Sequence, residues 1–184
     1  MRKLAVLGIV SLFAFVSVLL CAQQDKSKRP SPPGTASVSF ADGKKITIDY
    51  SRPKVNDPKS GQPRKIFGEL VPYDKVWRTG ANEATSFVTD ADVMVNDLHV
   101  PAGKYTLYTV PGQNEWTIIV NKQTGQWGTE YDEKQDLGRT KVKAEKTSSP
   151  VEQFTIDLNK AGDKKANLDL AWENTKVSVP ITEH

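Results

Sequence analysis

The chain has 184 residues, with 25 basic and 22 acidic side chains and a formal net charge of +3. Basic residues are interspersed with acidic ones, so the composition argues against the basic stripe that nucleic-acid binding requires. One Cys and two His are too few for a disulfide framework or a clustered metal centre. No phosphate-binding or dinucleotide fingerprint is present, and we expect no metal and no cofactor.

The N-terminus has the order of an export signal. Two basic residues precede an uncharged apolar run from Leu4 to Leu20, which ends at Cys21 and Ala22. A basic start, an apolar centre and a small residue at the exit are typical of a secretory signal. We expect residues 1–22 to be removed and the mature protein to be periplasmic or secreted. Two alternatives stay open, namely an uncleaved membrane anchor and a lipid attached to Cys21.

Removal of this segment changes both charge and length. Basic residues then number 23 against 22 acidic ones, so the net charge falls to +1. Removing 22 of the 184 residues leaves 162, which is enough for one buried core. Residues 23–35 are polar and rich in proline, which predicts a flexible tether. We therefore expect one domain over residues 36–184.

Alternating apolar and polar residues dominate the rest of the chain. Val38 and Phe40 alternate before the Asp42-Gly43 turn, and a second alternating run follows it from Ile46 to Tyr50. Two such runs around Asp-Gly predict a β-hairpin. The pattern returns in residues 93–100, 105–109, 116–120, 154–158, 168–172 and 177–181. Many short strands predict an all-β domain, and we expect an antiparallel two-sheet β-sandwich, jelly-roll-like or immunoglobulin-like. Trp116 and Trp172 are in phase with their strands and are expected in the core.

Two irregular segments, residues 52–83 and 123–138, interrupt this rhythm. Long loops on a rigid β scaffold often carry function. The first ends in a run that places an aromatic ring and a guanidinium before Gly80, and an amide and a carboxylate after it. Arg52 stands at the end of a predicted strand, and Trp127 lies between glycines. The candidate ligand-binding residues are therefore Arg52, Trp77, Arg78, Asn82, Glu83 and Trp127.

These residue types support two interpretations. An arginine can clamp a carboxylate or a pair of sugar hydroxyls, and a tryptophan face can stack on a ligand ring. Alternatively, Arg78 and Glu83 pair with each other or with Arg52 and organise the loop, while Trp77 belongs to the core. We favour the second interpretation. Neither assigns a catalytic residue.

Long motifs in the chain resemble one bacterial family, the domain of unknown function 2911. They include Ile48-Asp49-Tyr50-Ser51-Arg52-Pro53, Arg64-Lys65-Ile66-Phe67-Gly68, the run from Val76 to Thr85, Pro101-Ala102-Gly103-Lys104-Tyr105 and Trp172-Glu173-Asn174. The resemblance extends from about Arg29 to Ile181 and implies an exported bacterial domain. It implies no activity, because the family has none assigned.

The function that best fits these observations is a non-catalytic extracytoplasmic module that binds a carbohydrate, a peptide or another envelope component. A hydrolase-like enzyme that uses Glu83 or an aspartate with Arg78 is one alternative. A structural partner in an envelope complex is another. The expected ligand is a small molecule, a glycan or a peptide, and membrane contact is expected only through the signal segment or a lipid on Cys21.

The export signal generates a first prediction. Because the apolar run ends at a small residue, the protein isolated from its native envelope should begin at Gln23. Intact-mass spectrometry measures this directly. A lipid-modified Cys21 or a retained Met1 would contradict cleavage after Ala22.

Overall fold

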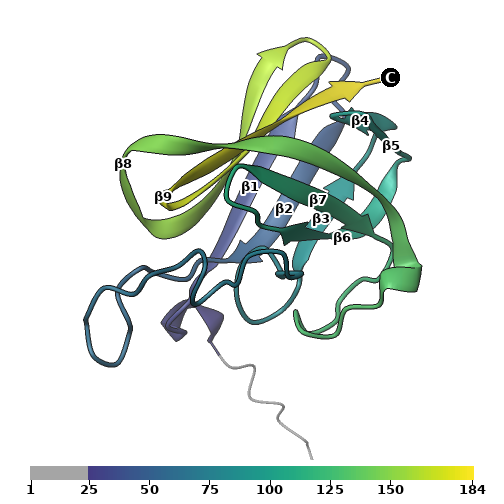
Figure 1. The fold of residues 1–184 in the computed structure, drawn as a ribbon. Helices are drawn as coiled ribbons and strands as arrows, with labels where there is room; N and C mark the ends of the chain where they lie inside the picture. The colour runs from purple at the N-terminus through teal and green to yellow at the C-terminus, as the bar shows by residue number, and fades with distance from the viewer. Residues whose placement is uncertain (1–24) are drawn as a thin grey trace, which may run out of the picture.

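The structure is a computed structural model that describes residues 25–184 (Figure 1). The expected signal segment and Cys21 therefore lie outside the described residues. Among the described residues, no helix is long and apolar enough to span a membrane. The elements are η1 Lys26–Lys28, β1 Pro33–Ser39, β2 Lys45–Ser51, β3 Thr85–Thr89, β4 Val93–Val95, β5 Leu98–Val100, β6 Gly103–Val110, β7 Glu115–Asn121, η2 Glu133–Gln135, β8 Asp136–Gly162 and β9 Lys165–Glu183.

Hydrogen bonds join the strands into one nine-stranded antiparallel sheet, in the order β1-β2-β3-β6-β7-β8-β9-β4-β5. The all-β antiparallel prediction is thus confirmed. The expected division into two separate sheets is not seen, because β8 runs through both halves of the sheet. Its first part pairs with β7 up to Lys143, and from Ala144 onward it pairs with β9. A two-sheet sandwich would have a separate strand in each half. Here one long, bent strand, β8, belongs to both halves of the sheet (Figure 1).

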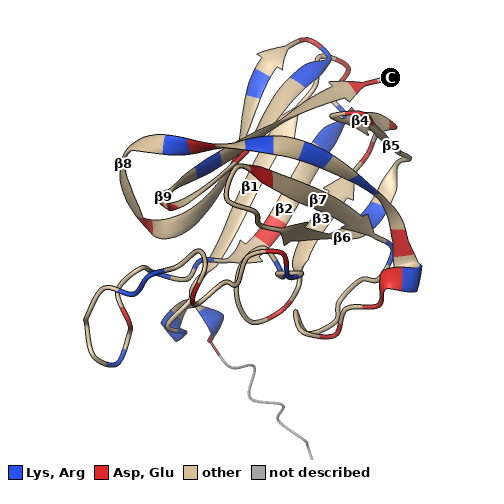
Figure 2. Ribbon diagram, viewed as in Figure 1, with Lys and Arg blue, Asp and Glu red and all other residues tan. Residues whose placement is uncertain are grey.

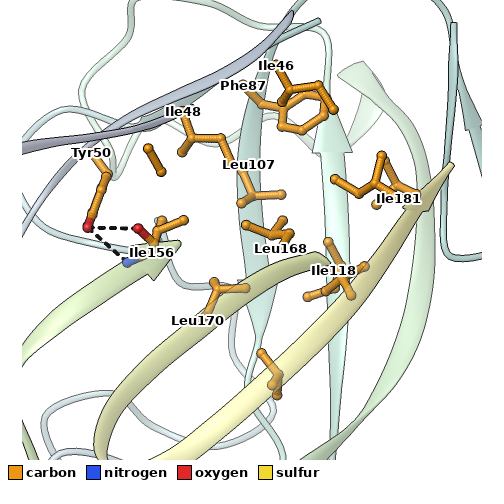
Figure 3. Close-up of a cluster of buried hydrophobic side chains, with 14 of the residues drawn as sticks. Ile46, Ile48, Tyr50, Phe87, Leu107, Ile118, Ile156, Leu168, Leu170 and Ile181 are labelled. Carbon is orange, nitrogen blue, oxygen red and sulfur yellow. Dashed lines mark hydrogen bonds between the residues drawn. The ribbon is translucent and has the colours of Figure 1, made fainter. Parts of the chain in front are cut away.

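The core lies on one face of this folded sheet. In β2, Ile46, Ile48 and Tyr50 are buried, whereas Thr47 and Asp49 between them point to the other face. Figure 3 shows the β2 side chains packed with residues of β3, β6, β7, β8 and β9. Period-two alternation therefore determines which side of β2 is buried.

The sheet closes on itself through the end of β2. The Tyr50 hydroxyl donates to the Ile156 carbonyl at 3.2 Å and accepts from the Ile156 N–H at 2.9 Å (Figure 3). Because the N–H and C=O of one residue point to the same side in an antiparallel strand, these groups face away from β9. Arg52 continues the closure, since its Nε donates to the Phe154 carbonyl at 3.3 Å. The Phe154 N–H in turn donates to the Pro53 carbonyl at 2.8 Å, so the edge of β8 at Phe154 and Ile156 is paired instead of exposed.

Aromatic side chains fill the end of the core that carries the irregular segments. Trp116 and Trp172 are buried, as expected, and Phe67 packs edge-on against both rings, at 5.0 Å and 6.1 Å. Trp77 stacks on Trp172 at 5.9 Å and meets Phe154 at 5.0 Å. Aromatic pairs in these geometries contribute roughly 0.5–1.5 kcal/mol each beyond area burial. This cluster is the rigid base on which the loops rest.

Residues 25–35 differ from the expected flexible tether. Strand β1 already begins at Pro33, and its first residue pairs with Ser51. Just before it, the Pro32 carbonyl accepts a hydrogen bond from the Arg52 N–H at 2.8 Å. η1 and both irregular segments lie at the same end of the molecule (Figure 1). The segment after the expected signal is therefore part of the loop end of the domain.

The closure of β8 generates a second prediction. Tyr50→Phe keeps the ring and removes the hydroxyl, which leaves the buried N–H and C=O of Ile156 without a partner. We expect the free energy of unfolding to fall by about 1–3 kcal/mol. Urea denaturation of the variant and of Tyr105→Phe measures the difference. Tyr105 is the matched control, because its hydroxyl donates only to the exposed Pro101 carbonyl; equal stability of the two variants would contradict the closure.

Candidate functional site

A cleft of about 600 Å³ opens at the loop end of the sheet. Its walls come from the segment after β2, the loop before β3 and the loop between β7 and β8, and Pro30 and Ser31 complete one side. Trp77 and Trp172 both line it, so the aromatic cluster forms its base. Small-molecule sites are typically roughly 300–1,000 Å³, and this cleft falls within that range.

Trp77 is held in the cleft by backbone and ring contacts. Its N–H donates to the Thr109 carbonyl at 2.7 Å, and its indole Nε1 donates to the Gly80 carbonyl at 3.1 Å. Gly80 has a φ of 156°, and a Cβ there would lie 2.9 Å from the Ser51 carbonyl oxygen. This turn therefore requires glycine. Trp77 is neither wholly in the core nor free in solvent, because it packs on the cluster and still lines the cleft.

Arg78 lines the same cleft and passes directly over Gly128. A Cβ at position 128 would overlap the Arg78 Cδ and lie 2.8 Å from the Asn82 carbonyl oxygen. The Arg78 Nε is buried and has no hydrogen-bond partner among the described residues. Burial lowers the pKa of the guanidinium, and nearby Tyr108 opposes this shift. Arginine nevertheless stays protonated in proteins, so the cleft contains a partly buried positive charge.

The charge of the cleft is of one sign. Lys54, Arg64 and Arg78 line it, and no Asp or Glu is among its lining residues in the described part of the chain. Elsewhere both signs alternate along strands and loops (Figure 2). Arg64 is already engaged, because its Nε and Nη2 donate to the carbonyls of Val55 and Lys54 at 3.2 Å and 2.6 Å. Arg78 is thus the guanidinium available to a ligand.

Glu83 does not pair with Arg78. Its two carboxylate oxygens accept from Arg29 Nη1, both at 2.9 Å, and Lys26 Nζ lies 3.1 Å from Oε1. The expected pairing of Arg78 and Glu83 across the Gly80 turn is therefore wrong. The physical reason is that the N-terminal segment, which was expected to be a free tether, brings two cations to Glu83.

These cations dominate the titration of Glu83. Partial burial would raise the pKa of its carboxyl, but the hydrogen bonds from Arg29 and Lys26 outweigh burial and lower the pKa to about 2. Glu83 is consequently ionised at neutral pH. We interpret it as the anchor of the N-terminal segment.

Arg52 and Asn82 are engaged with other residues of the domain. Arg52 Nη2 donates to the Thr155 hydroxyl at 3.1 Å, in addition to its bond to the edge of β8. Asn82 adopts a φ of 59°, which asparagine tolerates better than most residues, and its side chain donates to the Ser31 carbonyl at 3.2 Å. Neither is a cleft-lining residue. Both hold the loop and the N-terminal segment together.

Trp127 is 47% exposed. Its backbone forms an isolated bridge with Glu83. The ring is not among the cleft-lining residues, whereas the next two residues, Gly128 and Thr129, are. Of the six candidates, the structure therefore brings only Trp77 and Arg78 together in the cleft.

Sequence reasoning missed two further contributors. Gly128 follows Trp127, and its role as the floor beneath Arg78 is visible only in three dimensions. Tyr131 lines the cleft, and its hydroxyl donates to Asp136 at 2.8 Å and accepts from Arg139 at 2.8 Å. Burial and the Asp136 carboxylate raise the pKa of Tyr131, so its hydroxyl stays neutral. The aromatic content of residues 123–138 was the one available signal.

The structure identifies no candidate metal centre in residues 25–184, where no three His, Cys, Asp or Glu side chains gather in a suitable group. The chemistry of the cleft is instead that of hydrogen-bond donors beside an aromatic wall. Such an arrangement can hold an acceptor-rich or anionic group against a flat apolar surface.

The pairing of Glu83 generates a third prediction. Its pKa in the folded chain is about 2, below its ordinary value of 4.5, so its contribution is complete above pH 4.5 and disappears as the pH falls through about 2. Because this side chain is 37% exposed, we expect Glu83→Gln to cost only about 0.5–1 kcal/mol at neutral pH.

Thermal melts of wild type, Glu83→Gln and Glu130→Gln between pH 7 and pH 2 test this. Glu130 is the control, because it is exposed and forms no ion pair within residues 25–184. The gap between wild type and Glu83→Gln should close as the pH falls toward about 2. A constant gap over that range would contradict the assigned ion pair.

Comparison with known families matches residues 31–181 to the family described as "Protein of unknown function (DUF2911)". No curated protein and no solved structure matches the chain. The match extends from just before β1 into β9 and includes the whole cleft wall between β2 and β3. The resemblance expected from the sequence motifs is confirmed, and the chain belongs to the DUF2911 family.

Proposed function

We propose that this protein is an exported, non-catalytic binding module that holds an anionic ligand in the cleft beside Trp77 and Arg78. Arg78 is the observation that carries the proposal. Its guanidinium is partly buried, lines the cleft and has a buried Nε without a partner among the described residues. A buried charge that lacks a counter-ion is costly. A carboxylate or phosphate on the ligand would supply the missing charge and accept from the guanidinium.

The apolar wall indicates the rest of the ligand. Leu70 and Val76 are large apolar side chains that are 47% and 39% exposed, and both line the cleft together with Trp77. An acidic sugar, an acidic peptide end or a similar envelope component presents a charged group on an apolar or ring-shaped body. The charge would bind Arg78, and the body would cover these side chains.

The same two residues weaken the structural-partner alternative. Exposed apolar side chains on a docking protein are expected to form a broad patch. Here Leu70 and Val76 belong to a concave cleft with a charged wall. A small or narrow ligand fits this arrangement better than a flat protein surface does.

The hydrolase-like alternative has no comparable support. It needed Glu83 or an aspartate beside Arg78, and a carboxyl of raised pKa would have favoured it. The pKa of Glu83 is instead lowered to about 2, so this side chain cannot act as a proton donor near neutral pH. In addition, the described lining of the cleft contains no carboxylate.

The proposed location follows from the N-terminal signal. Residues 1–22 have the order of an export signal, and export would place the domain outside the cytoplasm. Extracytoplasmic ligands such as acidic glycans and peptides would then be accessible to it.

Arg78→Gln tests the function. Isothermal titration with glucuronate, glucose 6-phosphate and neutral glucose compares a carboxylate, a phosphate and an uncharged body of similar shape. We expect one of the two acids to bind, glucose to bind at least tenfold more weakly, and Arg78→Gln to lose at least tenfold of the acid affinity, because it removes the clamping charge. The melting temperature should stay close to that of the wild type.

Lys143→Gln is the matched control, since it removes one exposed positive charge from β8 outside the cleft. It should bind as the wild type does. Gly128→Ala is a second variant, because a Cβ there displaces the Arg78 side chain without altering its charge. Equal binding of glucose and the acids, or wild-type binding by Arg78→Gln, would overturn the proposal.

A further inference from the structure

A second hollow, of about 580 Å³, lies on the outward face of β1, β2, β3 and β6. It is distinct from the cleft, with which it shares only Ser31. The core side of these strands is filled with Ile48 and Phe87, so the hollow is formed by the side chains that alternate with them. The proposed function involves the cleft beside Trp77 and Arg78 and not this surface.

Its floor is a row of polar residues in register across four strands. Thr35 of β1 pairs with Asp49 of β2, Asp49 with Ser86 of β3, and Ser86 with Thr106 of β6. Neighbouring strands are about 4.8 Å apart, so the row offers hydroxyl and carboxylate groups at regular spacing across the hollow. The Thr35 hydroxyl donates to Asp49 at 2.6 Å, and Thr106 is engaged by the loop after β7.

Unused hydrogen-bonding groups remain at the centre. Within residues 25–184, the Ser86 hydroxyl and the Lys104 ammonium form no side-chain hydrogen bond or ion pair. Asp49 uses Oδ1 for Thr35 and retains Oδ2 as an acceptor. A donor, an acceptor and a hydroxyl that can do both are therefore directed into one hollow.

The walls carry charges of both signs. Lys26 and Arg29 stand on one side, and both are paired with Glu83, which also lines the hollow. Lys104 and Asp49 contribute one free charge of each sign. The lining of the hollow has three cations and two anions, a net charge of +1, whereas the cleft has three cations and no carboxylate. An anion therefore gains less in the hollow than beside Arg78.

Apolar surface is present beside the polar row. Pro33, Ala84 and Val88 line the hollow at the level of the floor. Sugars combine hydroxyl groups, which need both donors and acceptors, with C–H faces that pack on apolar side chains. We propose that this outward face is a second binding site, for a neutral saccharide of one or two rings.

NMR titration of the ¹⁵N-labelled protein tests the site. The probes are maltose, cellobiose and N,N′-diacetylchitobiose, with glucuronate as the charged comparison. At least one neutral sugar should shift the amide signals of Thr35, Asp49, Ser86 and Thr106 in a saturable way. Ser86→Tyr should abolish these shifts, because the ring fills the centre of the floor while β-strand preference is kept.

Ser39→Tyr is the matched control, since Ser39 is an exposed residue of β1 outside the hollow. Ser39→Tyr should retain the shifts. Arg78→Gln should also retain them, and this result would show that the hollow binds independently of the cleft. If Ser86→Tyr fails to fold, Asp49→Ala replaces it and should weaken the same shifts at least fivefold.

Three results would overturn the proposal. The first is that none of the three neutral sugars shifts the floor residues. The second is that the shifts persist in the folded Ser86→Tyr or Asp49→Ala variant. The third is that glucuronate saturates the hollow more tightly than every neutral sugar, which would make it a second anion site.

Discussion

The pairing of the free β8 edge by the end of β2 is the constraint on which the rest of the structure depends. β8 leaves its partner β7 after Lys143, and from there one side of the strand has no neighbouring strand. Tyr50 pairs the N–H and C=O of Ile156 through its hydroxyl, and Arg52 donates to the carbonyl of Phe154. Because unpaired backbone groups in a buried edge are costly, this contact holds the folded sheet in one shape.

The closure also positions the loop end. Arg52 engages the carbonyl of Phe154, two residues before Ile156, and the Phe154 ring packs against Trp77 and Trp172. The loop after β2 therefore starts from a fixed point and rests on a fixed aromatic base. A cleft formed by irregular backbone can in this way keep a defined shape, as preorganised binding sites require.

The distribution of charge at the loop end separates two kinds of surface. The N-terminal segment neutralises Glu83 through Arg29 and Lys26, and this pairing leaves Arg78 without a carboxylate nearby in the described chain. One side of the loop thus pairs its cations with a carboxylate, and the other carries a guanidinium that has no carboxylate partner among the described residues. The proposed anionic and neutral ligands follow from this difference, which net charge alone does not reveal.

The sequence by itself determined the strands, the buried faces and the family, because alternation and turn residues act over a few neighbouring positions. It placed Trp116 and Trp172 in the core correctly and located the irregular segments. It did not determine the partners of Glu83 or Tyr50, which are 54 and 106 residues away along the chain. Those contacts depend on which segments the folded sheet brings together, so only the tertiary structure decided that Arg78 is free and Glu83 is paired.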